Sequence, residues 1–160
     1  MPRNRPRALR AEGTTRGPSP RSRDCAPPSR IHGLSTRTSL AVHRLEERCD
    51  SFYLHPGATD RALRRYRTFL HPPGRRPLYP QESMCPSCPG CAFDDVRHAR
   101  DVLDAVLERL PPRPRTELAR LVRPLDVALH RRTLPDPFAH RRPWRAEYWW
   151  HRRLGDPARG

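Results

Sequence analysis

Three cysteines stand at two successive two-residue spacings in the segment Cys85-Pro-Ser-Cys88-Pro-Gly-Cys91. Thiolates at this spacing can chelate one metal ion, because the turn between them directs both sulfurs to the same side. A proline after the first cysteine, with a glycine nearby, favours such a turn. The segment therefore predicts three ligands of a metal site, and a tetrahedral zinc site needs a fourth.

The fourth ligand is predicted to be His98. It follows Cys91 by seven residues, which places it two helical turns further along roughly the same face of a helix. Together with the three cysteines it would complete a Cys3His zinc site. Cys49 and His71 are more distant substitutes, and either would tie the front half of the chain to the back half.

An iron-sulfur cluster is the alternative cofactor, since bacterial ferredoxins continue the same two spacings to a fourth cysteine followed by proline. Asp95 and Val96 occupy those two positions here, so the pattern favours zinc. A third interpretation is that the cysteines are free thiols in a proline-rich loop. If zinc binds, we expect a structural role, because such a site supplies folding free energy of order 10 kcal/mol to a chain with a small core.

A second group of candidate residues mixes arginine with aromatic side chains near the C-terminus. Aromatic rings can stack on nucleic-acid bases, and guanidinium groups pair with phosphates. The alternative is that the tryptophans cover a small core while the neighbouring arginines extend into solvent. The candidate nucleic-acid-binding residues are Arg141, Arg142, Trp144, Arg145, Trp149, Trp150, Arg152 and Arg153.

The composition limits the function classes. All 32 basic residues are arginine, the formal net charge is +15, and 21 of the 160 residues are proline. The charge suits phosphate binding, yet arginine, alanine, proline and glycine are also the residues of GC-rich codons. No stretch reaches the ~20 apolar residues of a membrane span. The number of cysteines is odd, at five, and the sequence shows no export signal. Both observations argue against a disulfide framework. We expect a cytoplasmic protein.

Helices are the elements that must position these residues, and the sequence predicts a mainly α-helical fold. Residues 1–37 lack apolar periodicity, so a disordered basic tail is expected there. Apolar residues at three- and four-residue spacing predict a short helical hairpin in 38–70, followed by a proline-rich linker in 71–83. The metal-stapled cysteine-cluster module is expected to span 84–154, and 155–160 form a second tail.

Two amphipathic helices and one short aromatic helix are predicted within this module. The first begins near Phe93 and ends before Pro111. The second starts after Pro114, and Pro124 inside it either kinks the helix or opens a new one. Residues 143–154 are predicted to form the short aromatic helix, which would lie across the pair formed by these two amphipathic helices.

Residues 84–154 resemble small arginine-rich actinobacterial proteins with an N-terminal cysteine cluster. The resemblance rests on Leu-Val-Arg-Pro-Leu-Asp at 121–126, Arg-Thr-Leu-Pro-Asp-Pro at 132–137 and the pair Trp149 and Trp150. It implies a bacterial cytoplasm and brings no activity with it.

The leading functional hypothesis is a noncatalytic, metal-stapled binding or scaffolding protein with a protein partner. The alternatives are a nucleic-acid-associated accessory protein and an iron-sulfur redox protein. A phosphate-binding glycine loop and a serine nucleophile elbow are both missing from the sequence. Because Met84 directly precedes the cysteine segment, a further hypothesis is that translation begins at Met84 rather than at Met1.

Overall fold

The computed structural model describes residues 29–49, 51–85 and 87–156, and these contain helices but no β-strand. The mainly α-helical fold class is therefore confirmed. Most of the tail expected at 1–37 lies outside the described residues, as do residues 157–160. The elements are α1 (Thr36–Arg48), α2 (Ala58–Leu70), η2 (Cys91–Asp94), α3 (Val96–Arg109), α4 (Pro112–Arg132), η3 (Ala139–Arg141) and η4 (Trp149–Arg152), where η marks a 3-10 helix.

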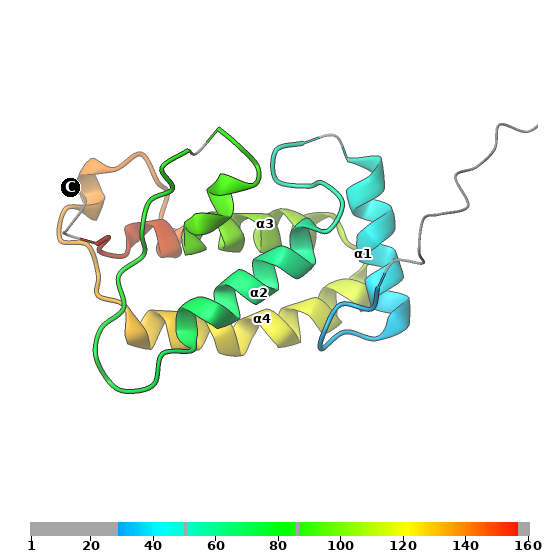
Figure 1. Cartoon of the computed structure of the whole chain (residues 1–160), viewed down its shortest axis with the longest axis horizontal. Helices are drawn as coiled ribbons and strands as arrows, with labels where there is room; N and C mark the ends of the chain where they lie inside the picture. Colours follow the sequence, from blue (N-terminus) through cyan, green and yellow to red (C-terminus); the bar gives the residue numbers. More distant parts are fainter. Residues whose placement is uncertain (1–28, 50, 86, 157–160) are drawn as a thin grey trace, which may run out of the picture.

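Helix α2 packs against both α3 and α4, and α1 stands across one end of these three helices (Figure 1). The chain then returns after α4, and its last short helix, η4, contacts α3. Among the helices that the structure describes, none has the length and apolar character needed to cross a membrane.

Local side-chain chemistry explains where three of the helices begin. The Ser35 side chain accepts a hydrogen bond from the backbone N–H of Thr38 at the start of α1. Asp95 does the same for the backbone N–H of Arg97 at the start of α3, at 2.8 Å. Such caps satisfy donors that a helix leaves without a partner in its first turn. Pro112 opens α4 at a position where a missing N–H costs nothing.

The start of α2 is capped by a side chain from another helix. Its N-cap residue is Gly57, with φ at +81°, a conformation that favours glycine. Glu46 of α1 accepts hydrogen bonds from the backbone N–H groups of Gly57 at 2.9 Å and Thr59 at 2.7 Å, and from the Thr59 hydroxyl at 2.6 Å. Because Glu46 is 1% exposed, these donors have replaced water around its carboxylate.

A similar contact joins α4 to the start of α1. The Glu117 carboxylate accepts hydrogen bonds from the backbone N–H of Ser35 and from the hydroxyls of Ser35 and Thr38. These bonds, that of Thr38 first, hold the pKa of Glu117 below its ordinary value, because they stabilise the charged form. The N-terminus of α1 is thus held by a residue of α4.

The hydrophobic core extends into the stretch that was expected to be disordered. Ile31 is 1% exposed and Leu34 is fully buried, and both belong to the same core cluster as Val42 of α1 and Leu118 of α4. The tail boundary at residue 37 is therefore wrong. Two isolated apolar residues carry no periodicity, so their burial becomes visible only when the helices around them are in place.

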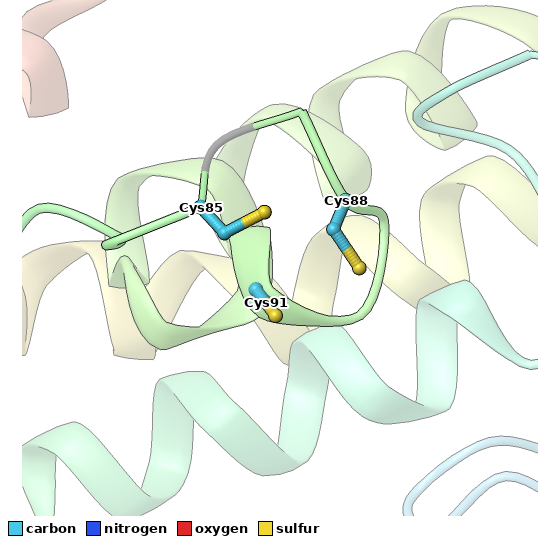
Figure 2. Close-up of side chains that lie close together, drawn as sticks. All are labelled: Cys85, Cys88 and Cys91. Atoms are coloured by element: carbon cyan, nitrogen blue, oxygen red, sulfur yellow. The ribbon is translucent and has the colours of Figure 1, made fainter.

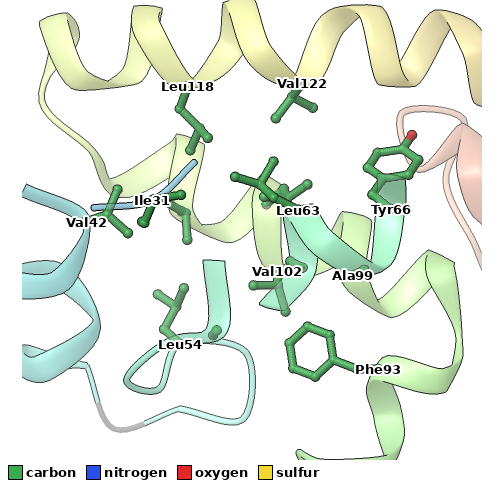
Figure 3. Close-up of a cluster of buried hydrophobic side chains, with 14 of the residues drawn as sticks. Ile31, Val42, Leu54, Leu63, Tyr66, Phe93, Ala99, Val102, Leu118 and Val122 are labelled. Carbon is green, nitrogen blue, oxygen red and sulfur yellow. The ribbon is translucent and has the colours of Figure 1, made fainter. Parts of the chain in front are cut away.

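The front and back halves of the chain share this one core. Leu63 and Tyr66 of α2 are fully buried and face Leu118 and Val122 of α4, with Val102 of α3 nearby (Figure 3). The expected hairpin and the expected cysteine module are therefore packed into one unit in the described chain, and α2 supplies part of the surface that covers α3 and α4.

A buried polar group ties the three central helices together. The Tyr66 hydroxyl donates to Oδ1 of Asp126 at 2.7 Å, and Nε of Arg100 donates to the same oxygen at 2.9 Å. Replacing Tyr66 with Phe is expected to lower the free energy of unfolding by about 1 to 2 kcal/mol, because the partly buried Asp126 then loses one of its two donors. Urea denaturation measures this. The half-exposed Tyr53 provides the control, Tyr53→Phe, with a change below about 0.5 kcal/mol.

Two expectations about the back half need correction. Helix α4 begins at Pro112 rather than after Pro114, and it continues through Pro124, so no new helix opens there. The aromatic helix expected at 143–154 is also wrong, because only the four residues of η4 are helical in that range. Instead, the backbone N–H of Leu154 bonds to the Leu134 carbonyl at 2.8 Å, which folds the segment back along the end of α4.

Candidate metal centre

The three cysteines lie on the loop that leads from α2 into α3. Its local hydrogen bonds explain its shape: the backbone N–H of Cys88 bonds to the Cys85 carbonyl at 3.4 Å, and that of Ala92 bonds to the Cys88 carbonyl at 2.9 Å. The Ser83 hydroxyl donates to the Cys91 carbonyl at 2.8 Å and accepts from the backbone N–H of Cys85 at 3.2 Å. Ser83 therefore closes the two ends of the loop onto each other.

The loop brings the three sulfur atoms together. Sγ of Cys85, Cys88 and Cys91 all lie within 4.8 Å of one another (Figure 2), and none of the three residues is buried. Four thiolates around a tetrahedral zinc at 2.3 Å would lie about 3.8 Å apart, so the cluster needs only a small contraction to bind one ion. The three cysteines form a group that can hold a metal ion.

The hydrogen bonds inside the loop shift the pKa values of two thiols in opposite directions. The backbone N–H of Cys91, followed by that of Gly90, lowers the pKa of Cys88 by bonding to its sulfur. The Cys88 sulfur in turn raises the pKa of Cys91, because a hydrogen bond to that sulfur and its negative charge both favour the protonated Cys91 thiol. Cys88 is thus the first of the two to become a thiolate, which is the form that binds metal.

Helix α2 holds this loop through two arginines that the sequence pattern did not single out. Nη2 of Arg61 donates to the Gly90 carbonyl at 2.8 Å, and its guanidinium lies 4.8 Å from the centre of the Phe93 ring. One turn further along, Arg65 donates to the Asp94 carbonyl. Because both contacts go to backbone oxygens, no motif could have revealed them. They place positive charge next to a cluster that becomes negative when its thiols ionise.

His98 is not part of the sulfur cluster. Among the described His, Cys, Asp and Glu residues, no fourth one joins the three cysteines in a metal-sized group. The His98 ring instead packs against the rings of Phe52, Tyr53 and Phe93, at centroid distances of 5.3, 5.5 and 5.0 Å. Burial lowers the pKa of His98. The structure therefore does not assemble the Cys3His ligand set.

The substitute ligands also lie elsewhere. Cys49 is half-buried against the hydrophobic core, and His71 is exposed at the end of α2. Asp95, which stands where a ferredoxin would have its fourth cysteine, caps α3 and is bonded to the Arg97 side chain at 2.8 Å. Neither the zinc nor the iron-sulfur pattern is completed by the described residues.

The candidate nucleic-acid-binding residues do not form one surface. Trp150 and Arg153 are buried: the Trp150 indole N–H donates to Asp101 at 2.7 Å, and the Arg153 guanidinium donates to Thr133. Trp149 is half-buried and lies 5.5 Å from the His130 ring. These three residues pack as the core-covering interpretation predicts. The members left exposed are Arg141, Arg142, Trp144 and Arg145, and Arg152 is half-exposed.

Comparisons of this chain with protein-family models, curated proteins and solved structures found no match.

Proposed function

We propose that the protein binds a zinc ion through Cys85, Cys88 and Cys91 and serves as a noncatalytic binding or scaffolding protein. The observation that carries this proposal is the convergence of the three sulfurs within 4.8 Å of one another. Thiolate ligands select zinc, copper(I) and iron-sulfur clusters. Zinc is favoured over iron-sulfur because Asp95 is engaged by Arg97 at the cap of α3 and is not available as a fourth cluster ligand.

The surroundings of the cluster suit a site that a partner completes. Among the described residues, no histidine or carboxylate joins the three sulfurs as a fourth ligand. Because the cluster is not buried, its fourth coordination position would face solvent. A water molecule or a side chain of a protein partner would complete it.

The composition of the core indicates which part of the chain a bound metal would stabilise. The core cluster is made chiefly by residues of the four α-helices and includes none of the three ligand cysteines. Zinc would therefore fix the loop between α2 and α3, and the helices would fold around their own apolar faces. This differs from the expectation of a metal-stapled module in which zinc supplies most of the folding energy.

Metal analysis of anaerobically purified protein, prepared without chelator or histidine tag, tests the proposal. We expect about one zinc per chain from three convergent thiolates, loss of at least nine-tenths of it in Cys88→Ser, and full retention in Cys49→Ser, whose thiol lies outside the cluster. The Cys88→Ser chain should keep its helical circular dichroism. Iron with visible absorbance, or no metal in the parent protein, would contradict a zinc site.

A further inference from the structure

A pocket lies between the loop after α1, the outer face of α3 and the C-terminal segment. Its volume is about 300 Å³, which falls at the small end of ligand pockets. An adjoining pocket of about 240 Å³ shares Tyr53, Asp101 and Trp144 with it. The two hollows therefore form one groove along α3, with Tyr53 and Trp144 on its sides. Ser83 and Ala92 line one end of the larger pocket, so the groove borders the cysteine loop, although none of the three cysteines lines it.

The groove is walled by aromatic rings that are already stacked in pairs. Tyr53 lies over His98 with ring centroids 5.5 Å apart and an interplanar angle of 28°. Trp144 lies over His151 at 3.7 Å and 9°. Tyr53 and Trp144 are 40% and 39% exposed, so each offers a ring face to a ligand. Planar, sequence-tolerant stacking on such faces contributes about 1 to 3 kcal/mol per nucleobase.

Polar groups that could form hydrogen bonds with the edge of a planar ligand line the same pocket. His151 Nε2 lies 2.7 and 2.9 Å from the two oxygens of Asp101. Because a carboxylate only accepts, Nε2 of His151 is the donor in this contact, and Nδ1 remains for a hydrogen bond to a ligand. His98 is 9% exposed, lines the pocket, and has its Nε2 buried with no hydrogen-bond partner. An unpaired buried polar atom is costly, and such atoms occur at functional sites.

The rim carries one arginine side chain, that of Arg142, that can reach a phosphate. Arg97 and Arg142 line the pocket. Arg142 has a half-exposed side chain, 3.4 Å from Asp136, while Arg97 is buried and is held by Asp95 and Glu82. Arg141 and Arg145 are exposed on the segment that carries Trp144. A ligand with a flat ring, an edge of donors and acceptors, and an attached phosphate matches these three features together.

We propose that this groove binds a nucleobase, either of a free nucleotide or of a single-stranded nucleic acid. The ring would stack on Trp144 or Tyr53, its amino and imino groups would bond to Asp101 and the two imidazoles, and its phosphate would lie at Arg142. A purely apolar ligand would leave the polar lining unpaired, which costs binding free energy. Of the arginine and aromatic residues that the sequence indicates for nucleic-acid binding, the site includes Trp144 and Arg142 and excludes the buried Trp150 and Arg153.

Calorimetric titration of the full-length chain tests the proposal with the four ribonucleoside monophosphates, eight-nucleotide homopolymers and ribose 5-phosphate as probes. We expect saturable binding of at least one base and about tenfold weaker binding in Trp144→Ala, from the loss of one stacking face. His98→Phe keeps a ring at that position, removes Nε2 and is expected to weaken binding severalfold. Trp149→Phe, which changes an aromatic residue outside the groove, should bind like the parent.

The outcomes distinguish three cases: a site for a free nucleotide, a site for a single-stranded nucleic acid, and binding through phosphate charge alone. Binding of monophosphates and strands alike supports a free-nucleotide site, and tight binding of strands alone supports a nucleic-acid site; both uphold base recognition. If ribose 5-phosphate binds with the same affinity as a nucleotide, phosphate charge alone is recognised and the proposal is overturned. The same conclusion follows if Trp144→Ala and His98→Phe both bind with the affinity of the parent protein. The absence of saturable binding by every probe would also overturn the proposal.

Discussion

A chain that starts at Met84 should fail to fold cooperatively. It would lack α1 and α2, and with them Leu63 and Tyr66, which are fully buried against α3 and α4. Burying one large apolar side chain contributes roughly 1.5 to 3 kcal/mol, and domains are stable by only about 5 to 15 kcal/mol in total. The shorter chain would also lack the buried core residues Ile31, Leu34, Val42 and Leu54. Six such side chains contribute roughly 9 to 18 kcal/mol, which is as large as the whole stability of a domain.

Thermal unfolding followed by circular dichroism measures this effect. The matched control is a chain that starts at residue 29, which retains every described helix and should unfold cooperatively. The shorter chain should show no cooperative transition and should bind a dye that reports exposed apolar surface. A cooperative melt of the Met84 chain within a few degrees of the control would mean that residues 84 onward fold alone, as the division into modules expected from the sequence requires.

Replacing Glu46 with Ala should destabilise the protein by about 3 kcal/mol. The substitution removes the acceptor of three hydrogen bonds from Gly57 and Thr59. The two Thr59 donors are then left unpaired in a fully buried position. It also removes a negative charge from the N-terminal end of α2, where the helix dipole favours one. Both effects act in the same direction.

The neighbouring residue provides a control for this prediction. Glu47 is exposed on the same helix, so Glu47→Ala should change the free energy of unfolding by less than about 0.5 kcal/mol. Denaturant titration of both variants gives the comparison. Equal, small effects in the two variants would show that Glu46 is not the cap of α2 and that the glycine turn alone starts the helix.

The helices could be predicted from the sequence because each carries its own signal. Apolar spacing marks α1 to α4, and Asp95 before α3 is an ordinary capping residue. Periodicity shows which face of a helix is apolar but not which helix it packs against, so the shared core was missed. The contacts of Glu46 and Glu117 were missed for the same reason, since the residues they cap are 11 to 82 positions away in the chain.

The cysteine part of the candidate metal centre could be predicted from the sequence, and the position of His98 could not. The cysteine spacing predicts convergent sulfurs because the ligands lie within seven residues of one another. The position of His98 depended on an unbroken helix from Phe93. The structure has a 3-10 turn there, then Asp95 in an extended conformation with φ −86° and ψ 119°, and α3 begins only at Val96. This interruption changes the direction of every later side chain relative to Cys91.

The cap that Glu117 provides for α1 also has a consequence for synthesis. Ser35 precedes its partner Glu117 by 82 residues. At 5 to 20 residues per second, the ribosome needs about 4 to 16 s to extend the chain from one to the other. Throughout that interval α1 has only its own Ser35 cap. A nascent chain stalled before residue 117 would thus expose an α1 that is free to fray, and this would make it a substrate for chaperones or proteases.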